Sequence, residues 1–139
     1  MENKKILKAD KNFIPPTNDD GDEYYPNGIF EFNITKLQEH LKNNPEKYKP
    51  EPLQVTDTYI QFSVIDEKHL PKADTTNPII IAEISPGNYN IIDGHHRMAR
   101  ACRTGQKEIM AYKLDPDTHT RFLTSTRSYL KYIEYWNSK

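Results

Sequence analysis

Apolar positions along this chain gather in short runs, which polar and proline-containing stretches separate. The most apolar run, residues 79–84, has the composition of an interior β-strand covered on both faces, and Pro78 suits its first position. Residues 85–88 have turn chemistry, so this strand and residues 89–92 are predicted to form an antiparallel hairpin. The hairpin leads directly into Asp93 and Gly94.

A helix is predicted between the two glycines Gly94 and Gly105. Met98, Ala101 and Cys102 recur at helical spacing and form a narrow face of small residues, which can pack close to a sheet. Cys102 is therefore interpreted as a core residue and not as a nucleophile.

Weaker patterns predict the remaining elements. Residues 35–38 have the form of a capping box, which would open a short helix with Leu37 and Leu41 on its inner face and an end at residues 43–45. A helical turn followed by a loop is expected within residues 64–74. The predicted strands are residues 28–34, 53–55, 59–62 and 109–114.

Asp115 and Pro116 have the residue types of a helix N-cap and a first helical position, so a long terminal helix is predicted to follow. Apolar residues recur there at helical spacing: Phe122, Tyr129, Leu130, Tyr132, Ile133, Tyr135 and Trp136. Most of this stripe is expected to be core. Its aromatic surplus is a candidate surface for a protein partner or a homodimer.

The composition fits one domain, because the chain has 139 residues of which 35% are apolar. Residues 1–24 have neither helix nor strand periodicity and are predicted to be an N-terminal extension, mobile or draped over a domain of residues 25–139. The single cysteine excludes an internal disulfide and a cysteine-rich zinc site. No N-terminal apolar run resembles a signal peptide or a membrane span, so we expect a soluble, cytoplasmic protein without a membrane partner.

The net charge of −1 conceals an asymmetry along the chain. Residues 1–93 contain 10 Lys/Arg and 16 Asp/Glu, whereas residues 94–139 contain 9 and 4. The basic half begins at the turn after the hairpin, which is consistent with an anionic ligand at that turn.

The polar residues of this turn are candidates for an anion site. The start of a helix leaves N–H groups without internal partners and carries a partial positive charge. Gly94 lets a ligand approach the main chain, because it has no side chain. His95, His96 and Arg97 add donors in the same turn, and Arg100 lies one turn further on. Phosphate is the expected occupant of such a site.

The stretch 93–97, Asp-Gly-His-His-Arg, resembles the signature of the ParB/sulfiredoxin superfamily, in which a strand and a glycine turn precede a basic or histidine-arginine helix start. The resemblance covers about residues 50–135. It implies a single ParB/sulfiredoxin-like α+β domain, with a small mixed sheet packed by helices, a phosphate-binding helix start after the hairpin and a long C-terminal helix. It also implies that residues 94–97 hold nucleotide phosphates.

Departures from the superfamily patterns narrow what the resemblance implies. His95 stands where sulfiredoxins have their catalytic cysteine, which argues against sulfiredoxin activity. The partition proteins read Gly-Glu-Arg-Arg at this turn, and this chain has no helix-turn-helix domain after it, which argues against DNA partition. The free-serine kinases are more similar at residues 93–95, and Glu83 and Glu67 are candidates for their separate catalytic glutamate.

Nucleotide-dependent phosphotransfer or hydrolysis is the activity that these residues favour, with ATP, ADP or CTP and Mg²⁺ as cofactors. Asp93 would hold Mg²⁺ or activate the nucleophile, and His95 or His96 would act as a donor or general acid. In the alternative interpretation, Asp93 only caps the helix, orients His96 or pairs with Arg97.

Two other classes of function remain open. The first is a ParB-like DNA-associated module or nuclease, although adjacent histidines point about 100° apart on a helix and share one metal ion with difficulty. His119 and Asp117 are the further ligands that such a site could use. The second is a non-catalytic module that senses a nucleotide and meets a protein partner through the C-terminal aromatic helix.

Overall fold

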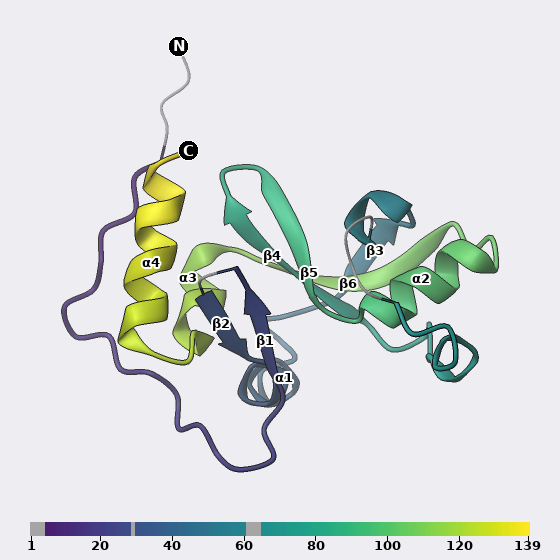
Figure 1. The fold of residues 1–139 in the computed structure, drawn as a ribbon, viewed down its shortest axis with the longest axis horizontal. Coiled ribbons are helices and arrows are strands. Elements are labelled where there is room, and N and C mark those ends of the chain that lie inside the picture. Colours follow the sequence, from purple (N-terminus) through teal and green to yellow (C-terminus); the bar gives the residue numbers. More distant parts are fainter. Residues whose placement is uncertain (1–4, 29, 61–64) are drawn as a thin grey trace.

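The structure is a computed structural model, and it describes residues 5–28, 30–60 and 65–139. It has the predicted class, a small α+β arrangement with a long helix at the C-terminus (Figure 1). The strands are β1 (Tyr24–Asn27), β2 (Phe30–Asn33), β3 (Glu51–Gln54), β4 (Ile79–Ser85), β5 (Asn88–Asp93) and β6 (Glu108–Leu114). The α-helices are α1 (Ile34–Asn43), α2 (His95–Arg103), α3 (Pro116–His119) and α4 (Thr126–Asn137). The described residues also form three short 3-10 helices: η1 (Asp57–Ile60), η2 (Leu70–Lys72) and η3 (Thr120–Phe122).

The larger sheet has the strand order β3-β6-β4-β5, and the smaller one pairs β1 with β2. The predicted hairpin is confirmed, because β4 runs antiparallel to β5; on its other side β4 runs parallel to β6. Ile80, Ala82 and Ile84 of β4 belong to one apolar cluster, and Ile79 and Ile81 belong to another. The most apolar run of the sequence is therefore an interior strand buried on both faces, as predicted.

The two faces of the larger sheet are covered differently. One face packs against α1, β2 and α4, and the buried residues there include Phe32, Leu37, Leu41, Tyr129, Tyr132 and Trp136. The other face packs against α2 through Met98 and Ala101, which are both fully buried. Cys102 lies at the margin of this second cluster and is half-buried. The predicted small-residue face of α2 therefore does contact the sheet.

Residues 5–23 form no helix or strand and run beside α4 and then to the start of α1 (Figure 1). The Leu7 N–H donates to Asn137 Oδ1 at 2.9 Å, and Trp136 Nε1 donates to the carbonyl of Lys5 at 2.8 Å. The Phe13 ring stacks on Tyr129 with centroids 4.0 Å apart. The N-terminal segment thus covers much of the aromatic face of α4, and a partner or dimer surface on this helix stays a prediction.

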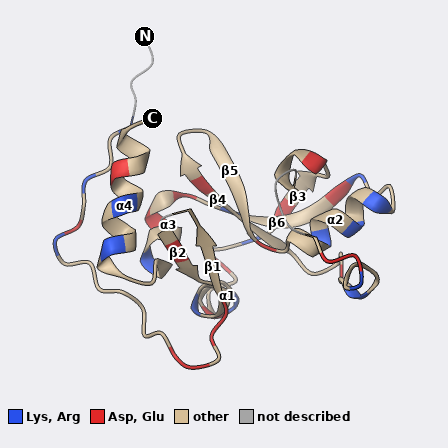
Figure 2. Cartoon of the chain, in the orientation of Figure 1, with Lys and Arg blue, Asp and Glu red and all other residues tan. Residues whose placement is uncertain are grey.

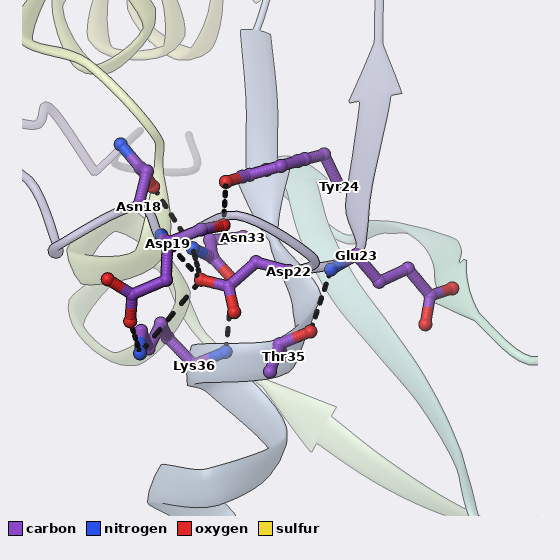
Figure 3. Close-up of polar contacts among 8 residues, drawn as sticks. All are labelled: Asn18, Asp19, Asp22, Glu23, Tyr24, Asn33, Thr35 and Lys36. Carbon is purple, nitrogen blue, oxygen red and sulfur yellow. Dashed lines mark hydrogen bonds and ion pairs between the residues drawn. The ribbon is translucent and has the colours of Figure 1, made fainter.

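Asn33 joins this N-terminal segment to α1 (Figure 3). Its side chain is fully buried, and its Oδ1 accepts from the Lys36 N–H at 3.0 Å, which makes Asn33 the N-cap of the helix. Its Nδ2 donates to Asn18 Oδ1 and to Asp22 Oδ2, each at 3.0 Å. The buried amide is therefore satisfied on both sides by contacts within the chain.

The predicted capping box at residues 35–38 is wrong, because α1 begins at Ile34 and is capped by Asn33. Thr35 Oγ1 accepts instead from the Glu23 N–H at 2.7 Å, and Gln38 reaches across to Asp93. The inner face and the end of the helix were predicted correctly.

Two other element predictions need correction, and a third, the helical turn expected within residues 64–74, is confirmed. The strand predicted at residues 28–34 is shorter, since β2 ends at Asn33; residue 29 lies outside the described residues. Tyr59 and Ile60, predicted as strand, lie in η1, and residues 61 and 62 are not described. The turn expected within residues 64–74 is η2, where Pro71 occupies the first helical turn; residue 64 is not described.

The predicted terminal helix is divided. Asp115 does cap a helix, but α3 ends at His119, and Leu123 is extended and forms a bridge with Phe32. Ser125 then caps α4 through a hydrogen bond to its side chain from the Ser128 N–H. Pairing with β2 interrupts the helical periodicity that the sequence suggests. In the described part of the chain, no helix is long and apolar enough to cross a membrane.

Candidate functional site

The hairpin delivers Asp93 to the end of β5, and Gly94 turns the chain into α2. Gly94 has φ +105° and ψ +26°, a left-handed conformation that favours glycine. A Cβ at this position would lie 2.5 Å from Ile79 Cγ2 and 2.8 Å from Arg97 Nη2. Both the backbone angle and the close approach to β4 therefore require glycine.

The start of α2 is open. Gly94 has no side chain to cap the helix, and the Met98 N–H makes the first bond of the helix, to the Gly94 carbonyl at 3.0 Å. Three main-chain N–H groups before Met98 have no hydrogen-bond partner among the described residues: those of His95, His96 and Arg97. These are the groups that bind anions at the start of a helix.

Arg97 pairs with Asp93, which is the alternative that the sequence left open. Arg97 Nη2 donates to Asp93 Oδ2 at 3.0 Å, and the two side chains are only 15% and 12% exposed. Gln38 Nε2 donates to the same oxygen at 2.8 Å, so α1 also holds the carboxylate. Arg97 Nε is buried without a partner among the described residues. The guanidinium is thus fixed beside the open helix start.

The adjacent histidines diverge. His95 Nε2 lies 3.4 Å from the Tyr25 hydroxyl, and the two ring centroids are 5.1 Å apart. His96 Nε2 accepts from the Asp66 N–H at 3.1 Å, on the side of His69. Burial, the largest influence, lowers the pKa of His95, so its imidazole is neutral at pH 7. The two rings do not converge on one point, which is what adjacent positions on a helix predict.

Arg100 is occupied with the loop before β4. One of its guanidinium nitrogens, Nη1, donates to the carbonyl of Pro71 and, at 2.8 Å, to the carbonyl of Ala73. The side chain predicted to extend the anion site therefore holds η2 against α2. Arg100 does not line the cleft in front of α2, but it holds the segment that contributes Lys72 and Ala73 to the lining.

An open cleft of about 810 Å³ lies in front of the start of α2. Its charged and histidine lining side chains are Glu23, His69, Lys72, Asp74, Asp93, His95, His96 and Arg97. The predicted residues 93–97 all line it, whereas Arg100 does not. Hydrogen bonds from Thr76 fix the Asp74 carboxylate and lower its pKa. The cleft thus combines an open helix end with both cationic and anionic side chains.

Glu23 is a cleft residue that the sequence prediction missed. It follows Asp22 in the network around Asn33, and Figure 3 shows its side chain pointing away from that network. Partial burial and then the Asp93 charge raise the pKa of Glu23, although Arg97 opposes them. The glutamates proposed from the sequence lie elsewhere: Glu67 pairs with Arg103 at 2.6 Å, and Glu83 accepts from the Gly87 N–H at 2.9 Å. No local pattern marks Glu23, since it lies 70 positions before Asp93.

The cleft could hold Mg²⁺ only together with a ligand. Among the described residues, no group of three or more His, Cys, Asp or Glu side chains is arranged to hold a metal ion. Mg²⁺ commonly uses one or two carboxylates and completes its shell with phosphate oxygens and water. Glu23 and Asp93 both line the cleft and could supply such carboxylate oxygens, although Asp93 Oδ2 already accepts from Arg97 and Gln38. His119, a metal ligand in the nuclease alternative, is buried and bonds through Nε2 to the Glu83 carbonyl at 2.8 Å.

Comparisons of the chain with known proteins found no relative. The chain matches no protein-family model. No curated protein and no solved structure matches it at the significance that we required. Membership of the ParB/sulfiredoxin superfamily therefore stays a prediction from the residues around Gly94.

Proposed function

We propose that the cleft at the start of α2 binds the phosphate groups of a nucleotide together with Mg²⁺. The observation that carries this proposal is the open helix end: three main-chain N–H groups, contributed by residues 95–97, have no partner among the described residues and belong to residues that line the cleft. Such N–H groups, together with the helix dipole, favour phosphate.

Basic side chains around the helix end support the same ligand. Arg97 is held beside it by Asp93, and η2 contributes Lys72 to the lining of the cleft. The His69 side chain is 67% exposed and lies near His96, with ring centroids 6.3 Å apart, and its Nε2 is 3.1 Å from Asp66 Oδ2. These groups can contact an anion without breaking the core of the domain.

The carboxylates of the cleft support a metal-bound phosphate over a bare one. Glu23, Asp74 and Asp93 would repel a free phosphate, and a Mg²⁺ ion between carboxylate and phosphate removes that repulsion. We assign Glu23 and Asp93 as the residues that would hold this ion. When bound, Mg²⁺ neutralises charge on the phosphate groups and polarises the bond between them.

Phosphotransferase or nucleotidase activity extends this proposal. In that extension, Asp93 orients the metal or the nucleophile and His96 donates a proton or a hydrogen bond to the phosphate. The resemblance of residues 93–97 to the ParB/sulfiredoxin superfamily supports the same placement of phosphate.

A thermal-shift panel tests the binding proposal. We expect ATP, ADP, CTP or GTP with Mg²⁺ to raise the Tm, by an amount equivalent to about 2.7 kcal/mol at a ligand concentration 100 times Kd. The double variant Lys72→Ala/His96→Ala should lose most of this shift. Lys131→Ala on α4 is the matched control and should keep it. Arg97→Ala is a poorer test, because it leaves Asp93 without its ion-pair partner.

Absence of a shift with all four nucleotides would overturn the proposal, as would a shift that the double variant retains in full. Removing Mg²⁺ with a chelator should weaken binding, because the cleft carboxylates then face the phosphates directly. Phosphate release, measured on the same samples, separates an enzyme from a binding protein.

A further inference from the structure

A second cavity, of about 550 Å³, lies beside the charged cleft. Its walls include three tyrosine rings, Tyr25, Tyr59 and Tyr89, and we call it the tyrosine cavity. We infer that the tyrosine cavity binds the base of the nucleotide whose phosphates the neighbouring cleft holds. This inference rests on the proposed function. It identifies the base as the part of the nucleotide that the protein would recognise specifically.

The two cavities share a boundary. Tyr25 and His95 line both of them, and the Tyr25 hydroxyl lies 3.4 Å from His95 Nε2. His95 also contributes one of the open N–H groups of α2. A ligand with phosphates at the helix start could therefore extend past Tyr25 and His95 into the tyrosine cavity.

The two cavities differ in charge. The cleft is lined by five Asp, Glu, Lys or Arg side chains, whereas the described lining of the tyrosine cavity has none of these residue types. Figure 2 shows the corresponding hairpin as mostly uncharged ribbon, and Glu83 and Asp93 are the charged residues of the segment 79–93. A nucleotide has the same division, with charge confined to its phosphates and a neutral, planar base.

The chemistry of the tyrosine cavity suits a base. Tyr59 and Tyr89 are half-buried, so part of each ring is accessible, and aromatic rings bind bases by stacking. Lys113 Nζ lies 4.8 Å from the centroid of the Tyr89 ring and restricts the position of that ring. The Tyr59 and Tyr89 rings therefore offer stacking surfaces that are in position before a base binds.

Polar groups around the rings can read the edge of a base. Asn90 presents an amide with both donors and an acceptor, and the hydroxyls of Thr56 and Thr58 lie 3.1 Å apart. β5 is an edge strand of the larger sheet, so its outer main-chain groups have no neighbouring strand in that sheet among the described residues. A base has complementary donors and acceptors along its edge.

Titration calorimetry with and without a base on the ligand tests the inference. The ligands are inorganic triphosphate and the four common ribonucleoside triphosphates, each with Mg²⁺. We expect wild-type protein to bind at least one nucleoside triphosphate about 5- to 150-fold more tightly than inorganic triphosphate, the range of one stacked base. Tyr89→Leu and Tyr59→Leu should remove most of this difference and leave the affinity for inorganic triphosphate unchanged. Tyr48→Leu, at a tyrosine outside both linings, is the matched control.

The outcomes separate the two proposals. If inorganic triphosphate binds as tightly as every nucleoside triphosphate, or if Tyr89→Leu and Tyr59→Leu keep the nucleotide preference, the base assignment is wrong and phosphate binding stands. If neither class of ligand binds the wild-type protein, the proposed function itself is wrong, and the base assignment is overturned with it. Unfolding curves of the tyrosine variants exclude a loss that comes from misfolding.

Discussion

The starts of α1 and α2 contrast in how they use the same open backbone groups. At α1, the Ile34 N–H donates to the Glu23 carbonyl at 2.8 Å, and the Lys36 N–H donates to the Asn33 side chain at 3.0 Å. At α2, the cap is Gly94, and the first N–H groups have no partner among the described residues. One helix start is closed by its own chain, and the other faces a cleft.

The contrast shows that the N-terminus of a helix becomes a candidate anion-binding site when no residue of the chain caps it. The Asn33 side chain caps the start of α1, and Asp22 accepts from the same side chain, which lowers the pKa of Asp22. Glycine at position 94 leaves the equivalent space at α2 open. The same N-terminal segment that closes α1 also brings Glu23 to the cleft of α2.

The largest expected effect is that of Gly94→Ala, which should lower the free energy of unfolding by about 3 kcal/mol, because it combines a strained backbone with a clash against Ile79. Urea or thermal unfolding measures the loss. Gly87→Ala is the control: Gly87 has φ +77° but nothing within 4 Å of an added Cβ, so the cost should be about 1 kcal/mol. Equal losses in the two variants would show that the close approach to β4 does not matter.

Asn33→Ala should have a smaller effect, a loss of about 2 kcal/mol, because it removes the cap of α1 and leaves Asn18 and Asp22 without their donor. Asn33→Ser keeps an acceptor for the Lys36 N–H and should recover about half of that loss. Unfolding measurements on both variants separate the cap from the amide donor. If Asn33→Ser is as stable as wild type, the contacts to the N-terminal segment contribute nothing.

The smallest expected effect concerns pH at the open start of α2. Burial lowers the pKa of His95 from its usual value, so the neutral ring predominates at pH 7 and protonation increases as the pH falls. The added charge should then tighten sulfate binding about 2- to 5-fold on acidification, by an electrostatic gain typical of a helix end. Sulfate with Mg²⁺ present is the suitable probe, since sulfate keeps its charge over this range and Mg²⁺ offsets the cleft carboxylates that would repel a free anion.

Titration of sulfate by calorimetry at several pH values measures this change. His95→Gln should bind sulfate with a flatter pH dependence, whereas His40→Gln on α1 should behave like wild type. A pH dependence that persists in His95→Gln would assign it to another group.

Local patterns were sufficient for the elements around the site. Alternation, turn residues and two glycines predicted the hairpin, α2 and β6, and the residues that line the cleft from position 93 to position 97 were all predicted. These features depend on backbone preferences within a few residues, which the sequence records directly.

Long-range partners explain the failures. Thr35 has the residue type of a cap, but Asn33 occupies that role because Asn18 and Asp22 approach its amide from 15 and 11 positions away. The terminal helix divides because Leu123 pairs with Phe32, far earlier in the chain. Neither contact leaves a local pattern.

The sequence by itself determined the class of the domain, the interior strand β4 and the glycine turn that starts α2, because hydrophobic period and backbone angle are local properties. Only the tertiary structure decided that Arg97 pairs with Asp93, that Arg100 holds a loop and that Glu23 enters the cleft. Hydrogen bonds and ion pairs act over about 3 Å, so their partners depend on how separate segments meet. The local pattern located the helix start, and the folded chain decided which side chains surround it.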